Sequence, residues 1–414
     1  MDVIMHHLDA DYTAHPVRLP RRAMRSLLLL PVLAVVAAVA LLPNETASQV
    51  GPTQTPPNFK VAFIGDQAIG QNAVDVLELI QTEGADMVLH QGDLGYGLEL
   101  VPQTAIDWDE QITNILGDDF PYFASIGNHD VGNWATYQSL LVARLGQVAG
   151  ASCTGDYGVM ATCTYQGLYF ILSGAGSSPI VPDYAPHIDY IQDQLAADNS
   201  IWRICAWHKN QTAMQVGSKP NEVGWGPYEA CRQGRAIIAT AHEHSYSRTK
   251  TLSNVQTQTV DSLWTDPNDL RVSAGSTFVF VSGLGGHSIR HQKRCLPTTP
   301  PYGCNGEWAS IYTFNQGATY GALFIEFHVD GDPAKASGYF KDIDGDVIDS
   351  FTITSEVGSV GGFADGPTVD EAPLEDDAAS GSDTYLFVGV TAAIAASAVA
   401  FAGGVWYVTR RRGR

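Results

Sequence analysis

The hydrophobic residues of the chain fall into short runs that each end in polar residues. Residues 60–66 (KVAFIGD) and 86–93 (DMVLHQGD) are apolar until a glycine–aspartate pair closes the run. Residues 202–210 (WRICAWHKN) and 236–244 (AIIATAHEH) follow the same plan and close on histidines. Short continuous apolar runs are typical of strands that are buried on both faces. The pattern therefore predicts interior strands with polar side chains at their carboxyl ends.

Helical periodicity appears between these runs. In residues 72–84, Val74, Leu77 and Ile80 share one side of a helix, and Gly84 is placed to cap its end. Residues 187–199 have the same spacing. The later part of the chain is rich in strand patterns, at residues 276–283, 321–329 and 336–354. The alternation predicts an α/β layered domain with mixed sheets over residues 58–354.

Three aspartates spaced by two, Asp342, Asp344 and Asp346, allow a calcium loop as an alternative to a turn. Asp344–Gly345 lies between strand patterns, which is a hairpin signal, and the rest of an EF-hand loop is missing from the sequence. We therefore expect a hairpin.

Two longer apolar segments frame this domain. Residues 26–42 follow a cluster of arginines and read as an export signal, with cleavage near Ser48, or as an uncleaved anchor. Residues 384–408 are long enough to span a bilayer, and the arginines at 410–414 would hold that end in the cytoplasm. Residues 355–383 are acidic and rich in glycine and serine, which is typical of an extended stalk.

The sequence thus predicts five parts: a basic region with a signal at 1–48, the α/β domain at 58–354, the stalk at 355–383, a transmembrane helix at 384–409 and a basic tail at 410–414. This layout places a single-pass protein in the cell membrane with its main domain outside the cell. The sequons at Asn44 and Asn210 matter only in a host that glycosylates.

Charge and cysteine content fit that compartment. The chain of 414 residues has a formal net charge of −21, which argues against a general nucleic-acid binding surface. Its six cysteines suit an oxidising environment. We expect sequential pairing (153 with 163, 205 with 231, 295 with 304), which is one of the fifteen connectivities that six cysteines allow. No protein partner can be inferred from the sequence.

The polar residues that follow the strand patterns are carboxylates, an amide and imidazoles: Asp66, Asp93, Asn128, His208, His242 and His244. In α/β sheets, ligands bind beyond the carboxyl ends of the strands, so we expect these side chains to converge. Their chemistry suits Fe, Zn or Mn, and their number suits two ions. One aspartate must then bridge the ions, at a spacing of roughly 3.5–4 Å. Each residue alone could equally be an ordinary turn or packing residue.

Five motifs in order, GDQ, GDLGY, GNHD, the lone histidine of AWHKN and AHEHSYSR, resemble the calcineurin-like metallophosphoesterases. The resemblance extends over residues 60–351 and implies a four-layer α/β/β/α sandwich. The first motif of most members is Asp-x-His, but this chain has Ala68 in place of the histidine. Purple acid phosphatases also lack that histidine and have a tyrosine in the second motif, as here at Tyr96. The chain therefore resembles that branch.

By resemblance, Asp66, Asp93, Tyr96 and His244 would hold the first metal, Fe(III), with Tyr96 as a phenolate ligand. Asp93, Asn128, His208 and His242 would hold the second, Fe(II), Zn or Mn, with Asp93 bridging. His129 would protonate the leaving oxygen of a phosphate ester, and Asp130 would orient His129. The branch usually has glycine where this chain has Ala68 and Ala241.

The resemblance implies a membrane-anchored extracellular phosphatase in which a metal-bridging hydroxide attacks the substrate. A phosphodiesterase or nucleotide hydrolase using the same site is one alternative. A non-catalytic ectodomain that binds a ligand is the other. His287 and His291 stand in a glycine-rich stretch near the predicted site, but no motif assigns them a role.

Overall fold

The computed structural model describes residues 54–97, 101–177 and 184–357, all of which belong to a compact unit that ends at Val360. The predicted export signal and transmembrane segment, and the stalk from residue 358 on, lie outside the described residues. Within the described ranges, no helix is both long enough and apolar enough to cross a bilayer.

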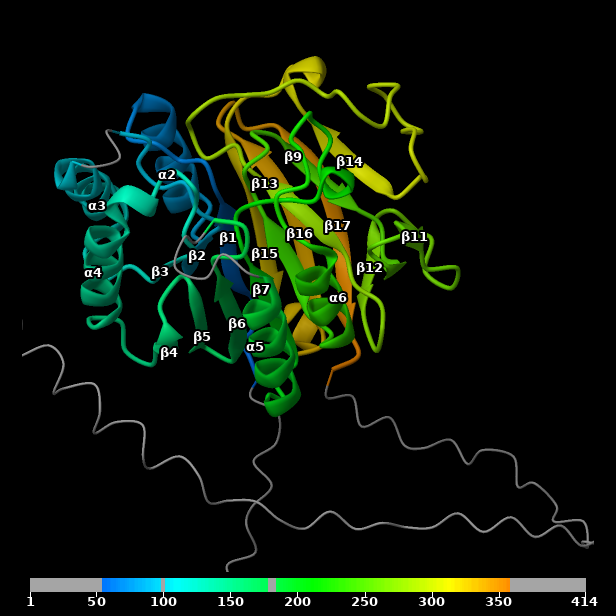
Figure 1. Ribbon diagram of the computed structural model, residues 1–414, viewed down its shortest axis with the longest axis horizontal. Coiled ribbons are helices and arrows are strands. Elements are labelled where there is room, and N and C mark those ends of the chain that lie inside the picture. The colour runs from blue at the N-terminus through cyan, green and yellow to red at the C-terminus, as the bar shows by residue number, and fades with distance from the viewer. Residues whose placement is uncertain (1–53, 98–100, 178–183, 358–414) are drawn as a thin grey trace, which may run out of the picture. The chain divides into compact units, whose positions relative to one another are not determined.

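Two large mixed sheets form the centre of the domain (Figure 1). In the first sheet the strand order is β12 (Asp269–Val272), β17 (Val347–Ser355), β16 (Lys335–Asp342), β15 (Gly321–Phe327), β1 (Phe59–Ile64), β2 (Met87–His90) and β3 (Tyr122–Ala124). In the second it is β14 (Trp308–Tyr312), β9 (Tyr246–Thr249), β13 (Val279–Ser282), β8 (Ile237–Thr240), β7 (Trp202–Ala206), β6 (Leu168–Ser173), β5 (Met160–Tyr165) and β4 (Ser152–Asp156). A short ribbon, β10 (Leu252–Asn254) and β11 (Thr259–Val260), stands apart.

The strands that carry the predicted site are parallel to one another within each sheet. β1, β2 and β3 run parallel in the first sheet, and β6, β7 and β8 do so in the second. The pairs on the far side of β1, β15 with β16 and β16 with β17, are antiparallel. The expectation of an α/β domain with mixed sheets is confirmed.

Five α-helices are described: α2 (Gln71–Thr82), α3 (Pro102–Leu116), α4 (Trp134–Leu145), α5 (Tyr184–Ala197) and α6 (Trp225–Gln233). The predicted helix over 72–84 is α2, and Gly84 follows it with a left-handed φ of 65°, the backbone that helix ends require of such a glycine. The predicted helix over 187–199 is the main part of α5. The sequence pattern did not predict α3, α4 or α6.

Alternating residues in the second sheet show how the layers stack. In β6, Leu168, Phe170 and Leu172 join the core between the two sheets, whereas Tyr169 and Ile171 join a second core with α5 and α6. Because successive side chains of a strand point to opposite faces, α5 and α6 must cover the outer face of this sheet. Figure 1 shows α2, α3 and α4 beside the first sheet. The resulting order is helix, sheet, sheet, helix.

Three disulfides join the cysteines sequentially, which confirms the predicted pairing. Cys153–Cys163 links β4 to β5, and Cys295–Cys304 closes a loop before β14. Cys205–Cys231 joins β7 to α6 and so attaches the outer helix to the second sheet.

The aspartate-rich segment forms a hairpin, as expected. It connects β16 to β17, with Gly345 at φ 92°. Asp342 Oδ1 accepts hydrogen bonds from the backbone N–H groups of Asp344 (3.1 Å) and Asp346 (2.9 Å), so the carboxylate stabilises the turn.

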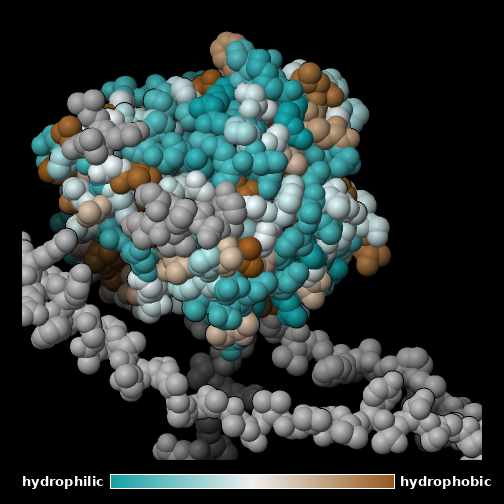
Figure 2. Space-filling view, in the orientation of Figure 1, coloured by the Kyte–Doolittle hydropathy of each residue, from teal (hydrophilic) through white to brown (hydrophobic). Residues whose placement is uncertain are grey.

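The face seen in Figure 2 is mostly hydrophilic, with hydrophobic residues scattered over it.

Candidate metal centre

The predicted ligands converge at one rim where the two sheets meet. Asp66, Asp93 and Asn128 follow β1, β2 and β3 of the first sheet, and His208 and His242 follow β7 and β8 of the second. A direct bond joins the two groups, because the His242 backbone N–H donates to Asp66 Oδ2 (2.8 Å). The site therefore depends on both sheets being in place.

The backbone of the rim is strained at ligand positions. Asp66, Asp93, Tyr96 and His242 have left-handed φ values of 57°, 58°, 48° and 67°. Such conformations cost non-glycine residues free energy and are concentrated at functional sites. They direct the side chains into the rim while the backbone turns away. Gly127 completes the arrangement, because a Cβ there would lie 2.1 Å from the Asp93 nitrogen.

The first half of the site gathers around the Tyr96 hydroxyl. This oxygen lies 2.6 Å from Asp66 Oδ1, 2.9 Å from Asp93 Oδ2 and 3.1 Å from His244 Nε2. The other nitrogen of His244 is hydrogen-bonded to Ser288 Oγ. The four predicted ligands of the first metal are thus in mutual contact.

The electrostatics of this half favour a highly charged cation. Burial opposes the charged form of Asp66, but the charge of His244 and the hydrogen bonds around Asp66 outweigh burial and hold the pKa of Asp66 well below its usual range. Burial and the charges of Asp66 and Asp93 raise the pKa of Tyr96 far above its usual value. A phenolate here requires a cation that offsets both carboxylates.

In the second half, three hydrogen-bond acceptor atoms face one another. His208 Nδ1 donates its proton to the Gln91 carbonyl (2.8 Å), which leaves a lone pair on Nε2. His242 Nε2 donates to Glu222 Oε2 (2.7 Å), which leaves a lone pair on Nδ1. Yet His208 Nε2 lies 3.0 Å from His242 Nδ1 and 3.1 Å from Asp93 Oδ2. Only a cation or an extra proton satisfies these three atoms.

Asn128 adds an oxygen to this half. Its Oδ1 is buried and has no hydrogen-bond partner among the described residues. Burial lowers the pKa of His242 to about 4, which favours the neutral imidazole. At His208 burial acts in the same direction, but the charge of Asp93 outweighs it and raises the pKa to about 9. Metal binding must therefore displace a proton from His208.

The residues present fit two metal ions. Asp93, His208 and His242 offer ligand atoms that lie within 4.8 Å of one another, and the unpartnered Asn128 oxygen belongs to the same predicted set. Two carboxylates and a phenol surround the first position, whereas the second has neutral ligands besides the shared Asp93. Carboxylate, phenol, amide and imidazole are the ligand types of iron, zinc and manganese.

Asp130 holds the loops together. Its buried carboxylate accepts backbone N–H bonds from Asp93 (2.9 Å), Leu94 (2.8 Å) and Gly127 (2.7 Å). It thereby joins the loop after β2 to the loop after β3. Burial and the charge of Asp93 raise the pKa of Asp130 to about 7. Its expected role in orienting the His129 ring stays a prediction.

His129 is half-buried beside the first half of the site. Its backbone N–H donates to Asp93 Oδ1 (2.8 Å), and its ring centroid is 4.7 Å from that of Tyr96. His287 stacks on the Tyr96 ring, with 3.6 Å between the two ring centroids and 14° between the ring planes. His291 instead packs against Phe314.

Several residues at the site carry no motif in the sequence. Glu222 contacts His242, Lys209 pairs with Glu222 (3.0 Å), and Lys219 Nζ lies 3.0 Å from His242 Nε2. Their spacing after His208 shows no periodicity that could have identified them. Only Ser288 stood in a suggestive stretch, the glycine-rich segment that also holds His287.

The two positions where the branch usually has glycine differ in their consequences. A Cβ added at Gly65 would lie only 2.3 Å from the Ala241 methyl group. The glycine at position 65 therefore leaves the space that this methyl group occupies. Ala68 adopts a left-handed φ of 67°, and its N–H donates to the Leu94 carbonyl (2.9 Å). Neither methyl group displaces a predicted ligand.

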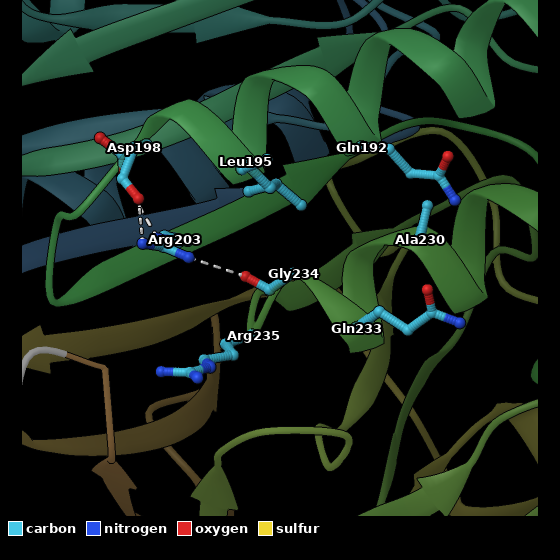
Figure 3. Close-up of a pocket in the computed structure, with 9 residues that line it drawn as sticks. Gln192, Leu195, Asp198, Arg203, Ala230, Gln233, Gly234 and Arg235 are labelled. Carbon is cyan, nitrogen blue, oxygen red and sulfur yellow. Dashed lines mark hydrogen bonds and ion pairs between the residues drawn. The ribbon is translucent and has the colours of Figure 1, made fainter.

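A separate cavity of about 520 Å³ lies between α5 and α6 (Figure 3). Leu195, Arg203 and Gly234 are among its lining residues, and Arg203 is bonded there to Asp198 and to the Gly234 carbonyl. None of the predicted metal ligands lines it. α6, which lines this cavity, belongs to the outer helical layer.

Residues 59–246 match the family model of the calcineurin-like phosphoesterases. This segment contains every predicted ligand. Over these residues the chain is similar to the calcineurin-like phosphoesterases. The resemblance found in the five motifs is thereby confirmed, and the family is one of metal-dependent phosphoric ester hydrolases with a dinuclear centre.

Among solved structures, the domain is similar to the purple acid phosphatase PPD1 from seeds of yellow lupin (Lupinus luteus), at 18% identity and a TM-score of 0.50. The match covers 73% of this chain and 55% of the lupin chain, so this chain spans little more than half the length of that enzyme. At this identity the likeness shows the fold.

Two further structures show weaker likeness. GAP50 of Plasmodium is 11% identical, with a TM-score of 0.47 and coverage of 72% of this chain and 90% of that one. PhoD is 11% identical, with a TM-score of 0.43 and coverage of 73% and 74%. No curated protein sequence matches the chain significantly.

Proposed function

We propose that the protein is an acid phosphatase-like phosphomonoesterase with a dinuclear metal centre. The observation that carries this proposal is the acceptor-only group formed by Asp93 Oδ2, His208 Nε2 and His242 Nδ1. Such a group is stable only with a bound cation or an extra proton, and it stands next to a second set of ligands that shares Asp93.

Asp66, Asp93, Tyr96 and His244 would hold Fe(III), and Asp93, Asn128, His208 and His242 would hold Fe(II), Zn or Mn. When bound, the two cations would lower the pKa of a water molecule and neutralise charge on the phosphoryl group. The protein's own part is to fix the geometry. Gln91 and Glu222 orient the two imidazoles of the second half, and Asp130 fixes the loops that carry Asp93 and Asn128.

His129 is the proposed acid for the leaving oxygen. Its backbone is fixed by Asp93 Oδ1, and its half-buried ring lies at the edge of the ligand set. A protonated imidazole there can donate to the departing alkoxide. We expect His129→Ala to keep both metals and to slow hydrolysis about 10²-fold, with less loss for substrates whose leaving group needs no proton.

The test uses the full-length chain, with metal content determined on each sample. A chromogenic phosphomonoester and the corresponding diester are assayed in parallel, with Asn128→Ala as the blank. Hydrolysis of the monoester that is lost in Asn128→Ala supports the proposal. If the diester is preferred, the alternative of a phosphodiesterase applies. If neither ester is hydrolysed while both metals are bound, the phosphatase proposal fails in favour of a ligand-binding domain.

The iron assignment has its own test. A tyrosinate bound to Fe(III) gives a visible charge-transfer band. We expect the oxidised protein to be coloured and Tyr96→Phe to lose the colour while it still binds iron. A colourless protein that is fully loaded with iron would contradict the assignment.

We further propose that the domain is extracellular and anchored by residues 384–408, with the segment at 26–42 acting as a signal. The apolar length of residues 384–408, the arginines that follow them and the acidic stalk support this arrangement. The three disulfides agree with an oxidising compartment. Protease added to intact cells should remove the domain from the membrane fraction. Protection until the cells are lysed would contradict this location.

A further inference from the structure

Two basic residues stand at the metal centre, and among the described residues neither forms a close ion pair with a carboxylate. Lys219 Nζ lies 3.0 Å from His242 Nε2, beside the second half. The Arg290 N–H donates to the His244 carbonyl (2.9 Å), beside the first half. Burial and the charge of Arg290 lower the pKa of Lys219, whereas the charges of Glu222, Asp66 and Glu243 raise it.

The contact between Lys219 and His242 is not a hydrogen bond when His242 serves as a ligand. His242 Nε2 then carries the proton that it donates to Glu222 Oε2. An N–H group cannot accept from the Lys219 ammonium group, so the ammonium needs another acceptor. Glu222 is already engaged with His242 and with Lys209 (3.0 Å). The lysine that pairs with Glu222 is therefore Lys209 and not Lys219.

The backbone under both cations is braced. The Lys219 carbonyl accepts hydrogen bonds from Thr212 Oγ1 (3.0 Å) and Gln215 Nε2 (2.9 Å). The Arg290 N–H donates to the His244 carbonyl (2.9 Å), and the Arg290 carbonyl accepts from the Phe314 N–H (2.9 Å). Preorganised groups of like charge at a ligand rim are typical of a site for an anion.

We propose that Lys219 and Arg290 bind a non-ester phosphate oxygen of the substrate and make the site selective for phosphate monoesters over diesters. This inference rests on the proposed phosphoesterase function. A monoester phosphoryl group has three non-ester oxygens, and two of them can face the two halves of the ligand set. The third oxygen faces the two cations. In a diester that position holds an alkylated oxygen, which carries no full negative charge.

The variants Lys219→Met and Arg290→Met keep much of the side-chain length and remove the charge. We expect each to lower kcat/KM for an aryl phosphomonoester about 10–100-fold and to weaken equilibrium binding of inorganic phosphate by a similar factor. Hydrolysis of the matching diester should change less than about 3-fold, since a screened charge at some distance has a small effect. Lys219→Arg should recover part of the monoester rate.

Lys293→Met is the matched control, because Lys293 is an exposed lysine on the same loop as Arg290. It removes the same charge and should leave both esters and phosphate binding unchanged. Metal content is measured for every variant. Equal losses for monoester and diester would overturn the inference, as would unchanged phosphate binding. Loss of metal in Lys219→Met would also overturn it, because Lys219 would then support His242.

Binding of inorganic phosphate, measured by calorimetry on the metal-loaded full chain, separates this inference from the proposed function. If the parent protein hydrolyses neither ester, the proposed function fails. The phosphate affinities of the parent and of the Lys219 and Arg290 variants still decide whether these residues form an anion site.

Discussion

The two halves of the metal centre share Asp93 but differ in how hydrogen bonds satisfy their ligand atoms. In the first half the Tyr96 hydroxyl donates its one proton to a carboxylate, Asp66 Oδ1, and its oxygen also lies 3.1 Å from His244 Nε2. In the second half His208 and His242 direct lone pairs at each other and at Asp93, and the Asn128 oxygen has no partner. The first half binds a metal only by losing the Tyr96 proton, whereas the second needs a cation or a proton to be stable at all.

This difference predicts which ion each half prefers. The first half has three potential negative charges, on Asp66, Asp93 and Tyr96, which suit a trivalent ion. The second half has neutral ligands besides the shared carboxylate, which suit a divalent ion. Lys219 lies beside His242 of the second half. We therefore expect the first half to be the more permanent part and the second to be the more exchangeable.

Asp93→Asn should break both halves at once, because Asp93 Oδ2 contacts Tyr96 and His208 while Oδ1 accepts the His129 N–H. We expect hydrolysis to fall by at least about 10³-fold and neither position to fill. Metal analysis and kcat for the monoester measure this. Asp75→Asn makes the same chemical change in α2, away from the site, and should change neither. Full metal content in Asp93→Asn would show that the halves do not depend on a shared carboxylate.

Chelation should separate the halves. A divalent ion held mainly by neutral ligands exchanges faster than a trivalent ion held by phenolate and carboxylates. We expect a chelator to abolish hydrolysis while the visible band of Tyr96 persists, and Zn²⁺ or Mn²⁺ to restore the activity. Absorbance and metal content followed over time measure the order of loss. Simultaneous loss of the band and of activity would contradict a difference between the halves.

Ser288→Ala tests how far the support of His244 matters. The Ser288 hydroxyl fixes one nitrogen of His244, and partners of this kind typically contribute 10–100-fold to metal affinity. We expect a strong chelator to remove the first metal about 10-fold faster than from the parent protein. The second metal should still be lost before the first. Ser262→Ala, at an exposed position, is the control. An unchanged rate would show that Tyr96 and the carboxylates alone hold this ion.

The smallest expected effect concerns the backbone under the first half. Ala68 has a left-handed φ of 67°, which costs an alanine about 1–2 kcal/mol, whereas glycine adopts it freely. Glycine also adds freedom to the unfolded chain, which offsets part of that gain. We expect Ala68→Gly to raise the free energy of unfolding by about 0.5–1 kcal/mol in denaturant titrations. The reverse change at Gly65 should destabilise, because its Cβ would meet Ala241 at 2.3 Å.

The sequence predicted the site better than it predicted the whole fold. Asp66, Asp93, His208 and His242 follow apolar strands, and the rule that ligands gather at strand ends brought them together correctly. α3 and α4 were missed because their polar residues are interspersed with single apolar ones, such as Trp108 and Tyr137, whose burial depends on the neighbouring strands. Local periodicity does not report such long-range packing.

Supporting residues of the centre were also beyond the sequence. Glu222, Lys219 and Arg290 belong to loops whose positions are set by hydrogen bonds to distant backbone groups. Asp130 shows the same limit, because its motif suggested a partner for His129, while its carboxylate is used by three backbone N–H groups. A motif fixes residue types at a spacing, but contacts between loops depend on the docked sheets.

The bond between the His242 backbone and Asp66 Oδ2 has a consequence for how the protein matures. These groups are 176 residues apart in the chain, and each belongs to a different sheet. Contacts of such long sequence separation form late, because the intervening chain must first be ordered. During synthesis the domain therefore emerges as an apoprotein with incomplete ligand sets. Metal loading should be a late step that follows docking of the two sheets, and a chain truncated before β8, which lacks both His242 and His244, should acquire neither ion.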